Sequence, residues 1–359
     1  MTKVKQQQTQ LFSDLPANKA GVLPSTRYQG SKYKIIKWID NYIKDLKFDS
    51  VLDAFGGTGC VGYTLKKNGK LVFYNDSLKF NYYVGLAIIE NSKTILDDDD
   101  VDFILKKHSK TKYPTFIYDT FHDIYFTDEE NKWLDVVITN IDQIKDKYKQ
   151  ALAYYALFQA CIIKRPYNLF HRKNLYIRTA EVERSFGNKK TWDTPFEEHF
   201  IKFVEEGNNA VFYNKKKNKA FHSDIFDLDV KADLVYIDTP YISAKGVGVN
   251  YYDFYHFLEG IVFYDRWPNL IDEKSKHKKI INGKNEWCSK GEIHQAFERL
   301  FRKFKDSILV VSYRDDGTPT IDELVKMLEN YKKSIEVKKL DYKYVLSNGN
   351  SKEVLIIAK

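Results

Sequence analysis

The first part of the chain alternates between helical and strand-like hydrophobic patterns. Residues 34–46 carry isoleucines at helical spacing and predict an amphipathic helix. The short apolar runs 50–55 and 71–74 predict buried strands, with a helix at 60–67 between them. This order of strand, turn, helix and strand predicts the start of a doubly wound, Rossmann-like α/β sheet.

Helical periodicity dominates the middle of the chain, and strand patterns return near residue 210. Residues 127–164 predict helix. Strands are predicted at 210–213, 220–223, 234–237 and 308–312, followed by a closing hairpin of 335–346 and 353–358 around Asn348-Gly349. We therefore expect one α/β domain that is split by an insertion.

The expected division has three parts. We predict a loose, polar N-terminal arm at 1–26, a catalytic domain made of 27–90 and 210–359, and an inserted, mostly helical region at 91–209. A chain of 359 residues is long enough for two domains.

Composition narrows the class of protein. The net charge of +8 favours a polyanionic partner, although solubility explains such a charge equally well. Cys60, Cys161 and Cys288 have neither metal-ligand nor disulfide spacing, so we expect no metal site and a reducing cytoplasm. No apolar run approaches the ~20 residues of a membrane span, and Met1–Gln10 lacks the apolar core of a signal peptide.

A glycine loop follows the first predicted strand. Gly57, Gly59 and Gly62 match the spacing of a dinucleotide-binding turn, so an NAD-dependent oxidoreductase is one interpretation. A turn without any ligand is another. Asp53, inside the strand, would repel a pyrophosphate but could hold the ammonium group of S-adenosylmethionine. Asp76, after the second strand, suits ribose hydroxyls with either ligand.

The tetrapeptide Asp238-Thr239-Pro240-Tyr241 follows the predicted strand 234–237. Open α/β sheets bind ligands at this carboxyl end of their strands. The carboxylate could accept hydrogen bonds from an amino group, and the tyrosine could stack on a flat ring. Taken without the glycine loop, the four residues favour a strand that ends in a proline turn.

Together these motifs resemble those of the alpha-class, Dam-like DNA adenine methyltransferases. The segment Asp53–Gly59 resembles the cofactor loop of that family, and Asp238–Tyr241 resembles its Asp-Pro-Pro-Tyr element. Tyr28–Lys32 resembles its N-terminal Gly-Gly-Lys element, and the order along the chain is the alpha-class order. The chain departs from the family pattern at two positions: Thr239 stands where the family has a proline, and Ser31 stands where it has a glycine. The first change removes a ring that would make the tetrapeptide rigid.

The resemblance implies S-adenosylmethionine as cofactor and assigns a set of residues to it. These are Tyr28, Gly30, Lys32, Asp53, Phe55, Gly57, Gly59, Asp76 and Asp224, with Asp224 near the cofactor adenine. It also implies the function of a restriction-modification enzyme that methylates N6 of an adenine in double-stranded DNA. A cognate restriction endonuclease is then a further partner to consider. Methylation of a cytosine amino group or of RNA adenine is the alternative, and a non-catalytic DNA-binding protein is another.

The chemistry expected of the tetrapeptide depends on two acceptors. The Asp238 carboxylate and the Thr239 backbone carbonyl would accept the two hydrogens of the adenine amino group. Pro240 would hold the turn, and Tyr241 would stack on the base. The base must leave the duplex to reach such a pocket.

The resemblance implies that the inserted region 91–209 is a target-recognition region, and its basic residues are candidates for DNA contact. Residues 164–174 mix cations, amides and aromatics, as phosphate and base-edge contacts require. We predict DNA contacts from Lys164, Arg165, Asn168, His171, Arg172, Lys173, Arg184, Lys189 and Lys190, with a solvated basic face as the alternative. Five lysines within 274–284 indicate either a mobile loop or a phosphate clamp.

Overall fold

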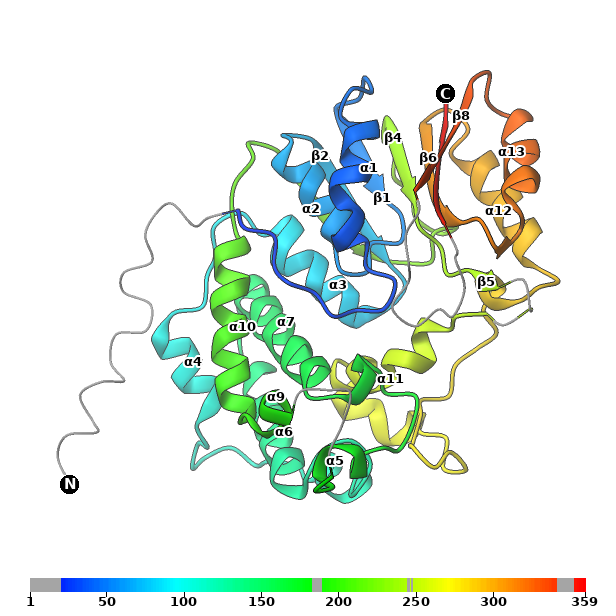
Figure 1. Ribbon diagram of the computed structural model, residues 1–359. Coiled ribbons are helices and arrows are strands. Elements are labelled where there is room, and N and C mark those ends of the chain that lie inside the picture. Colours follow the sequence, from blue (N-terminus) through cyan, green and yellow to red (C-terminus); the bar gives the residue numbers. More distant parts are fainter. Residues whose placement is uncertain (1–20, 183–188, 244–245, 247, 341–351) are drawn as a thin grey trace.

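The computed structural model describes residues 21–182, 189–243, 246, 248–340 and 352–359. A seven-stranded sheet forms its centre, in the order β3-β2-β1-β4-β6-β9-β8 (Figure 1). The five strands from β3 to β6 are parallel, whereas β9 is antiparallel to both β6 and β8. The strands are β1 (Ser50–Asp53), β2 (Leu71–Asp76), β3 (Lys219–His222), β4 (Leu234–Ile237), β6 (Ile308–Arg314), β8 (Ile335–Leu340) and β9 (Glu353–Ala358). The predicted doubly wound, mostly parallel sheet is confirmed.

Helices cover both faces of this sheet because successive strand residues point to opposite sides. Val51 and Tyr236 pack in a cluster with α1, α2 and α3, while Leu52 and Val235 pack with α12 and α13. These helices are α1 (Ile36–Ile43), α2 (Cys60–Lys67), α3 (Lys79–Gly85), α12 (Ile293–Lys303) and α13 (Ile321–Glu329). The short strands β5 (Ile242–Ser243) and β7 (Gly317–Thr318) pair with each other in a separate two-stranded sheet.

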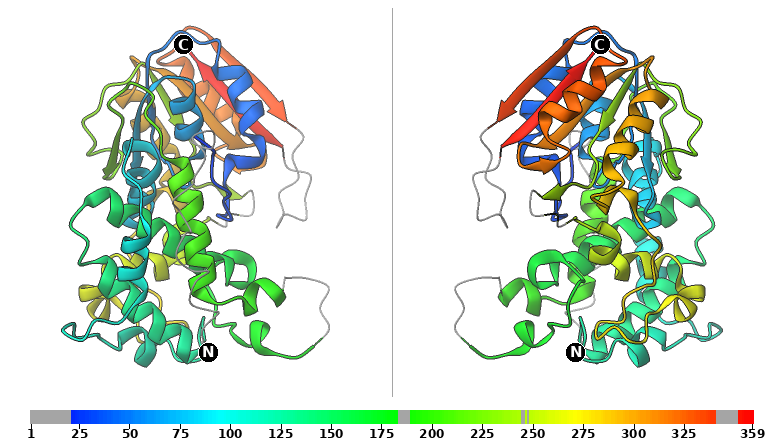
Figure 2. Two further views of the ribbon diagram at one scale, coloured as in Figure 1. Left: turned by 90° about the vertical axis from the view of Figure 1, so that its left-hand side faces the viewer. Right: turned by 90° about the vertical axis from the view of Figure 1, so that its right-hand side faces the viewer.

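A helical region occupies the interval between β2 and β3. It contains α4 (Asp98–Leu105), α5 (Phe116–Thr120), α6 (Asp128–Ile141), α7 (Lys147–Ile163), α8 (Tyr176–Thr179), α9 (Lys189–Asp193) and α10 (Phe196–Ala210). Its buried side chains continue the apolar cluster of α1, α2 and α3, so the region is packed firmly on one face of the sheet. In Figure 2 the helices α8 and α9 lie on the same side of the molecule as the strands β8 and β9.

The predicted helix 127–164 is two helices, α6 and α7. Each has its own N-terminal cap, because Thr127 forms a capping box with Glu130 and the Asp146 side chain accepts from Tyr148 N and Lys149 N. The helical prediction was right, but it missed the turn between the two helices.

The predicted strand 210–213 is wrong. Ala210 ends α10, and the residues after it have no regular structure. Val211 is buried by packing instead, and the half-buried Phe212 ring lies edge-on to Tyr63, at 5.5 Å between centroids, and under the Lys66 ammonium at 4.5 Å. A β-prone run can satisfy its need for burial without joining a sheet.

The expected loose arm is held in place where the structure describes it. Gly21 N donates to Asn209 O (2.9 Å), and Ser25 Oγ donates to Glu206 Oε2 (2.9 Å), so residues 21–26 are fixed to α10. Residues 1–20 and the predicted turn at Asn348-Gly349 lie outside the described residues, although the antiparallel pairing of β8 with β9 is confirmed. In the described parts of the chain, no helix is long and apolar enough to cross a membrane.

Candidate active site

One cavity lies at the carboxyl ends of β1, β2 and β4. Asp53 and Tyr236 are partners in the parallel pairing of β1 with β4, so Asp53 and Asp238 reach the same edge of the sheet. β1 lies between β2 and β4, which makes this the point where the strand order reverses and α/β sheets bind ligands. The lining residues come from all three predicted motifs and include Tyr28, Gly30, Lys32, Asp53, Phe55, Gly57, Asp76, Asp238, Pro240, Tyr251 and Tyr252.

The glycine loop takes its shape from backbone conformations that side chains disfavour. Gly57 and Gly59 have φ values of +51° and +71°, in the left-handed region. The Tyr74 ring fills the space beside Gly56, where a Cβ would lie 2.0 Å from it, and the Tyr74 hydroxyl donates to Gly57 O (2.7 Å). Sequence reasoning missed Tyr74, since nothing in the pattern of β2 distinguishes it from an ordinary core tyrosine.

Asp53 presents a buried carboxylate to the cavity. Its Oδ2 accepts from Gly62 N (3.0 Å), and a Cβ at Gly62 would lie only 3.0 Å from the same oxygen. Burial is the main cause that raises the pKa of Asp53 to about 7. No cation pairs with this carboxylate in the described structure. A cationic amine in the cavity would therefore complete the site, and S-adenosylmethionine carries one.

Asp76 braces the glycine loop from the end of β2. Its Oδ2 accepts from Gly57 N (2.9 Å) and Asn81 Nδ2 (3.1 Å), and its Oδ1 accepts from Leu78 N (2.8 Å). Burial raises the pKa of Asp76 to about 6 against these hydrogen bonds. The sequence predicted only a ribose ligand here, and the bracing role depends on contacts that spacing does not reveal.

A buried cation joins the N-terminal element to the catalytic tetrapeptide. Lys32 Nζ lies 3.0 Å from Asp238 Oδ1 and 3.3 Å from Glu353 Oε1. Glu353, on β9, is fully buried and also accepts from Ser312 Oγ (2.6 Å). Burial raises the pKa of Asp238 to about 6, although the attraction of Lys32 opposes the rise. Glu353 was not predicted, because it follows no motif and lies on an antiparallel strand at the far end of the chain.

The other members of the tetrapeptide differ in their exposure to the cavity. Pro240 lines it, and Thr239 is 2% exposed. Tyr241 is buried in the second apolar cluster, edge-on to Tyr313 and beneath the Arg314 guanidinium. Tyr241 is not among the residues that line the cavity in this conformation, and its role as the stacking plate stays a prediction.

Three other tyrosines form an aromatic wall, of which Tyr28 and Tyr251 line the cavity. The Tyr28 ring is parallel to and stacked with both Tyr251 (centroids 5.4 Å apart) and Tyr255 (4.3 Å apart). Gly30 makes room for this arrangement, since a Cβ there would lie 2.2 Å from the Tyr251 hydroxyl. The wall therefore explains why Tyr28 and Gly30 belong to the site.

A second cavity continues the first beyond Phe55. The two share Phe55, Ser77, Pro240, Tyr252 and Asn285, and the second is also lined by Asp224, Ile225 and Trp287. The Phe55 ring meets Trp287 edge-on at 5.1 Å. The lining of this second cavity mixes the apolar side chains of Phe55, Ile225 and Trp287 with three acidic residues, Asp224, Glu286 and Glu292, so the predicted place of Asp224 beside the cofactor adenine stays a prediction.

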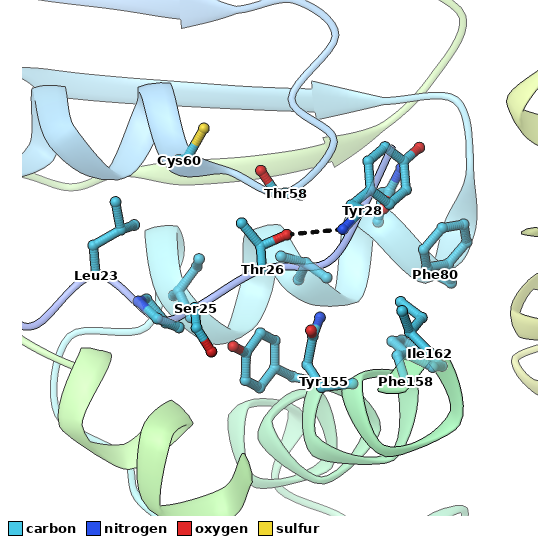
Figure 3. Close-up of a pocket in the computed structure, with 15 residues that line it drawn as sticks. Leu23, Ser25, Thr26, Tyr28, Thr58, Cys60, Phe80, Tyr155, Phe158 and Ile162 are labelled. Atoms are coloured by element: carbon cyan, nitrogen blue, oxygen red, sulfur yellow. Dashed lines mark hydrogen bonds between the residues drawn. The ribbon is translucent and has the colours of Figure 1, made fainter. Parts of the chain in front are cut away.

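A smaller cavity lies on the other side of the glycine loop (Figure 3). It is enclosed by residues 23–28, α3 and α7, and it shares Tyr28, Thr58 and Cys60 with the main cavity. Thr26 Oγ1 accepts from Tyr28 N (3.3 Å) at its edge. The segment before the N-terminal element thus forms part of the wall behind the site.

Two of the predicted DNA contacts are buried, which corrects that prediction. Lys164 is 2% exposed and pairs with Glu130 (2.8 Å), which Arg178 also binds. Arg165 is 1% exposed and donates to the carbonyls of Tyr125, Leu169 and Arg172. These cations satisfy buried acceptors and hold the following loop, so they cannot reach a phosphate in this conformation.

The remaining basic candidates lie on or near the surface. Arg172, Lys173, Lys189 and Lys190 are exposed, while Asn168 and His171 are half-buried. Tyr167, beside Asn168, is 51% exposed, and both residues have left-handed backbone conformations. Arg184 lies outside the described residues. The loop after α7 therefore presents its cations from a rigid base.

Comparison with known proteins agrees with this geometry. The model of the D12 class N6 adenine-specific DNA methyltransferases matches residues 28–327. The type II methyltransferase M2.HphI of Haemophilus parahaemolyticus is 31% identical over 92% of this chain and 95% of its own length. M.NlaIII of Neisseria lactamica is 25% identical, over 85% of this chain and 88% of its own. M.FokI of Planomicrobium okeanokoites is 26% identical, but this chain spans only 47% of it.

These matches include the cofactor loop and the tetrapeptide, and they set aside an NAD-dependent oxidoreductase. The chain belongs to the D12 class of N6 adenine-specific DNA methyltransferases.

Proposed function

We propose that this chain transfers a methyl group from S-adenosylmethionine to N6 of an adenine that has left a DNA duplex. Family membership supports the reaction class. The observation that carries the assignment of residues is the meeting of Asp53 and Asp238 in one cavity. One carboxylate suits the cationic donor and the other suits the amino group of the acceptor.

The cofactor would lie along the edge of the sheet from β4 to β2. Asp53 would hold its ammonium group, Asp76 its ribose hydroxyls, and Phe55 with Asp224 its adenine. The left-handed Gly57 lets the backbone come close to the ligand. Bound there, S-adenosylmethionine supplies an electrophilic methyl group.

Asp238 and Thr239 would act on the base. The lone pair of an adenine amino group is delocalised into the ring, so the nitrogen is a weak nucleophile. Hydrogen bonds from both N–H groups to the Asp238 carboxylate and the Thr239 carbonyl would localise that lone pair. The nitrogen loses a proton when it gains the methyl group, and Asp238 is the carboxylate placed to receive it.

Tyr251 and Tyr252 would join Tyr241 as candidate stacking surfaces for the base. Tyr251 and Tyr252 line the cavity beside Asp238 and Pro240. Stacking of a base on an aromatic ring contributes ~1–3 kcal/mol, which offsets much of the cost of unstacking it from the duplex.

Exposed Arg172, Lys173, Lys189 and Lys190 would bind the surrounding phosphates. Such an enzyme would work in the cytoplasm on double-stranded DNA, with a cognate restriction endonuclease as its functional partner.

Expression in a host that lacks adenine methylation tests the proposal. Sequencing that detects modified bases should show N6-methyladenine at one fixed DNA sequence, and D238A should abolish the signal. N4-methylcytosine in that DNA, or methyladenine confined to RNA, would refute the proposed substrate. Analysis of hydrolysed nucleosides would identify the product independently of sequence context.

A further inference from the structure

A buried tyrosine joins two loops that are distant in the sequence. The loop 169–174 follows α7, whereas the loop 271–281 follows α11 (Tyr251–Ile261) and belongs to the catalytic half of the chain (Figure 1). The Tyr125 hydroxyl lies within hydrogen-bonding distance of Phe170 O in the first loop and of His277 O in the second (3.0 Å). Tyr125 is fully buried, so water cannot substitute for these contacts.

His256 completes this junction without adding charge. Its Nε2 lies 2.8 Å from the Tyr125 hydroxyl and 3.0 Å from Phe170 O, and burial lowers the pKa of His256 to about 3. Its Nδ1 has no hydrogen-bond partner within the described structure, so we assign the proton of the neutral ring to Nε2. The Nε2–H then donates either to Phe170 O or to the Tyr125 hydroxyl oxygen, and the Tyr125 hydroxyl donates to Phe170 O or His277 O.

Further contacts make each loop rigid. Phe170 N donates to Phe254 O (2.9 Å), which ties the first loop to α11. In the second loop, Ile271 and Ile280 form an antiparallel bridge, and Asp272 N donates to Lys279 O (2.8 Å). The second loop is therefore held together by its own backbone hydrogen bonds.

Three cations point outward from these loops. Arg172, Lys274 and Lys276 are exposed, and none of them forms an ion pair with any residue that the structure describes. Neighbouring lysines, in contrast, do form ion pairs: Lys173 pairs with Asp123, Lys278 with Glu273, and Lys284 with Glu292. We call Arg172, Lys274 and Lys276 the basic platform.

We propose that the basic platform binds the DNA backbone, so that the loop 271–281 extends the DNA-binding surface beyond the inserted region. The inference rests on the proposed function, since it needs DNA as the substrate. Backbone phosphates are the partner that fits, because unpaired cations on a rigid base can bind them with little loss of conformational freedom. Phosphate contacts position a duplex but do not read its sequence.

The salt dependence of DNA binding tests the proposal. Each phosphate contact contributes about 0.9 to the slope of log K against log salt. K274Q/K276Q should therefore lower the slope by about 1.8, and R172Q by about 0.9, on a mixed-sequence duplex. The matched control is K44Q/K47Q, which removes two exposed lysines just before β1, at the opposite edge of the sheet, and should leave the slope unchanged.

Two outcomes separate this inference from the proposed function. If the unmodified protein methylates DNA and K274Q/K276Q has the same slope as the K44Q/K47Q control, the platform does not bind the backbone, while the enzyme assignment stands. If the unmodified protein binds DNA but transfers no methyl group to it, the proposed function fails instead. Circular dichroism of both double variants confirms that the charge, and not the fold, has changed.

Discussion

Lys32 Nζ lies 3.0 Å from Asp238 Oδ1, so the N-terminal element directly contacts the carboxylate proposed to receive the adenine amino hydrogens. The Lys32 side chain is 5% exposed, and solvent therefore screens the pair only weakly. Glu353 shares the same cation, so one positive charge balances two carboxylates. The acceptor strength of Asp238 thus depends on residues from both ends of the described chain.

Removal of the Asp238 carboxylate should abolish transfer without releasing DNA. Loss of one group that stabilises a transition state typically lowers kcat by about 10²–10³-fold, and D238A also removes the proposed proton acceptor. We therefore expect single-turnover transfer to fall by at least that factor while DNA affinity stays within about twofold. D306A, at an exposed acid before β6, is the control and should behave like the unmodified protein. Comparable activity in D238A would remove Asp238 from the mechanism.

Substitution of Lys32 should destabilise the fold. K32M leaves Asp238 and Glu353 as neighbouring buried carboxylates without their cation, and breaking a buried pair in this way costs about 3–5 kcal/mol. Chemical denaturation should show this loss at neutral pH. K34M changes an exposed lysine of the same short 3₁₀ segment (Lys32–Ile35) and should change the free energy of unfolding by less than about 0.5 kcal/mol.

Glu353 should set the acidic limb of the pH–rate profile. Transfer needs the Asp238 carboxylate, whose pKa burial and Glu353 raise while Lys32 lowers it, to about 6. The other titratable groups around it are Tyr236, Tyr241, Tyr251 and Asp53. E353Q removes a negative charge, so the pKa of Asp238 should fall and the limb should move to lower pH. E336Q, on β8, is the exposed control, and a limb that stays in place in E353Q would contradict this role.

Asp53 should contribute to cofactor binding at the expense of stability. Its pKa of about 7 lies above the ordinary 3.8, so its contribution to stability is complete below about pH 3.8 and is lost as the pH rises through about 7. D53N should therefore stabilise the ligand-free protein at pH 8, by on the order of 2–4 kcal/mol. The same variant should show no thermal shift with S-adenosylmethionine. D49N, just before β1, should retain that shift.

The packing around Tyr74 should tolerate no added methyl group. A Cβ at Gly85 would lie 2.4 Å from the Tyr74 ring, so G85A must displace the ring that supports the glycine loop. We expect a loss of about 1–3 kcal/mol in the free energy of unfolding and weaker binding of S-adenosylmethionine. A Cβ at Gly291 meets nothing within 4 Å, and this glycine lies outside the lining of both cavities, which makes G291A the matched control for denaturation and calorimetry.

Local signals predicted the central part of the site well. The strand before Asp53, the left-handed glycine loop and the strand before Asp238 all depend on neighbouring residues, and parallel pairing then brings the strand ends together. The strands around Ala220 and Ile308 were predicted for the same reason.

The features that sequence reasoning missed depend on distant partners. Arg165 looked like a phosphate ligand, but its buried acceptors come from Tyr125 and from the loop that it supports. The Tyr241 ring lies edge-on to Tyr313, a contact with a distant strand that the motif does not predict. Glu353 acquires its role only because β9 inserts between β6 and β8. Hydrophobic periodicity and motif spacing carry no record of such long-range contacts.

The position of β9 also has a consequence for protein synthesis. β9 is the last strand of the described chain to leave the ribosome, yet it supplies the second carboxylate that Lys32 contacts. The sheet around β1, β2 and β4 can form earlier, with its glycine loop in place, but the charge balance at Asp238 is completed only when β9 pairs with β6. A nascent chain that has not yet paired β9 with β6 therefore holds Lys32 without its contact to Glu353.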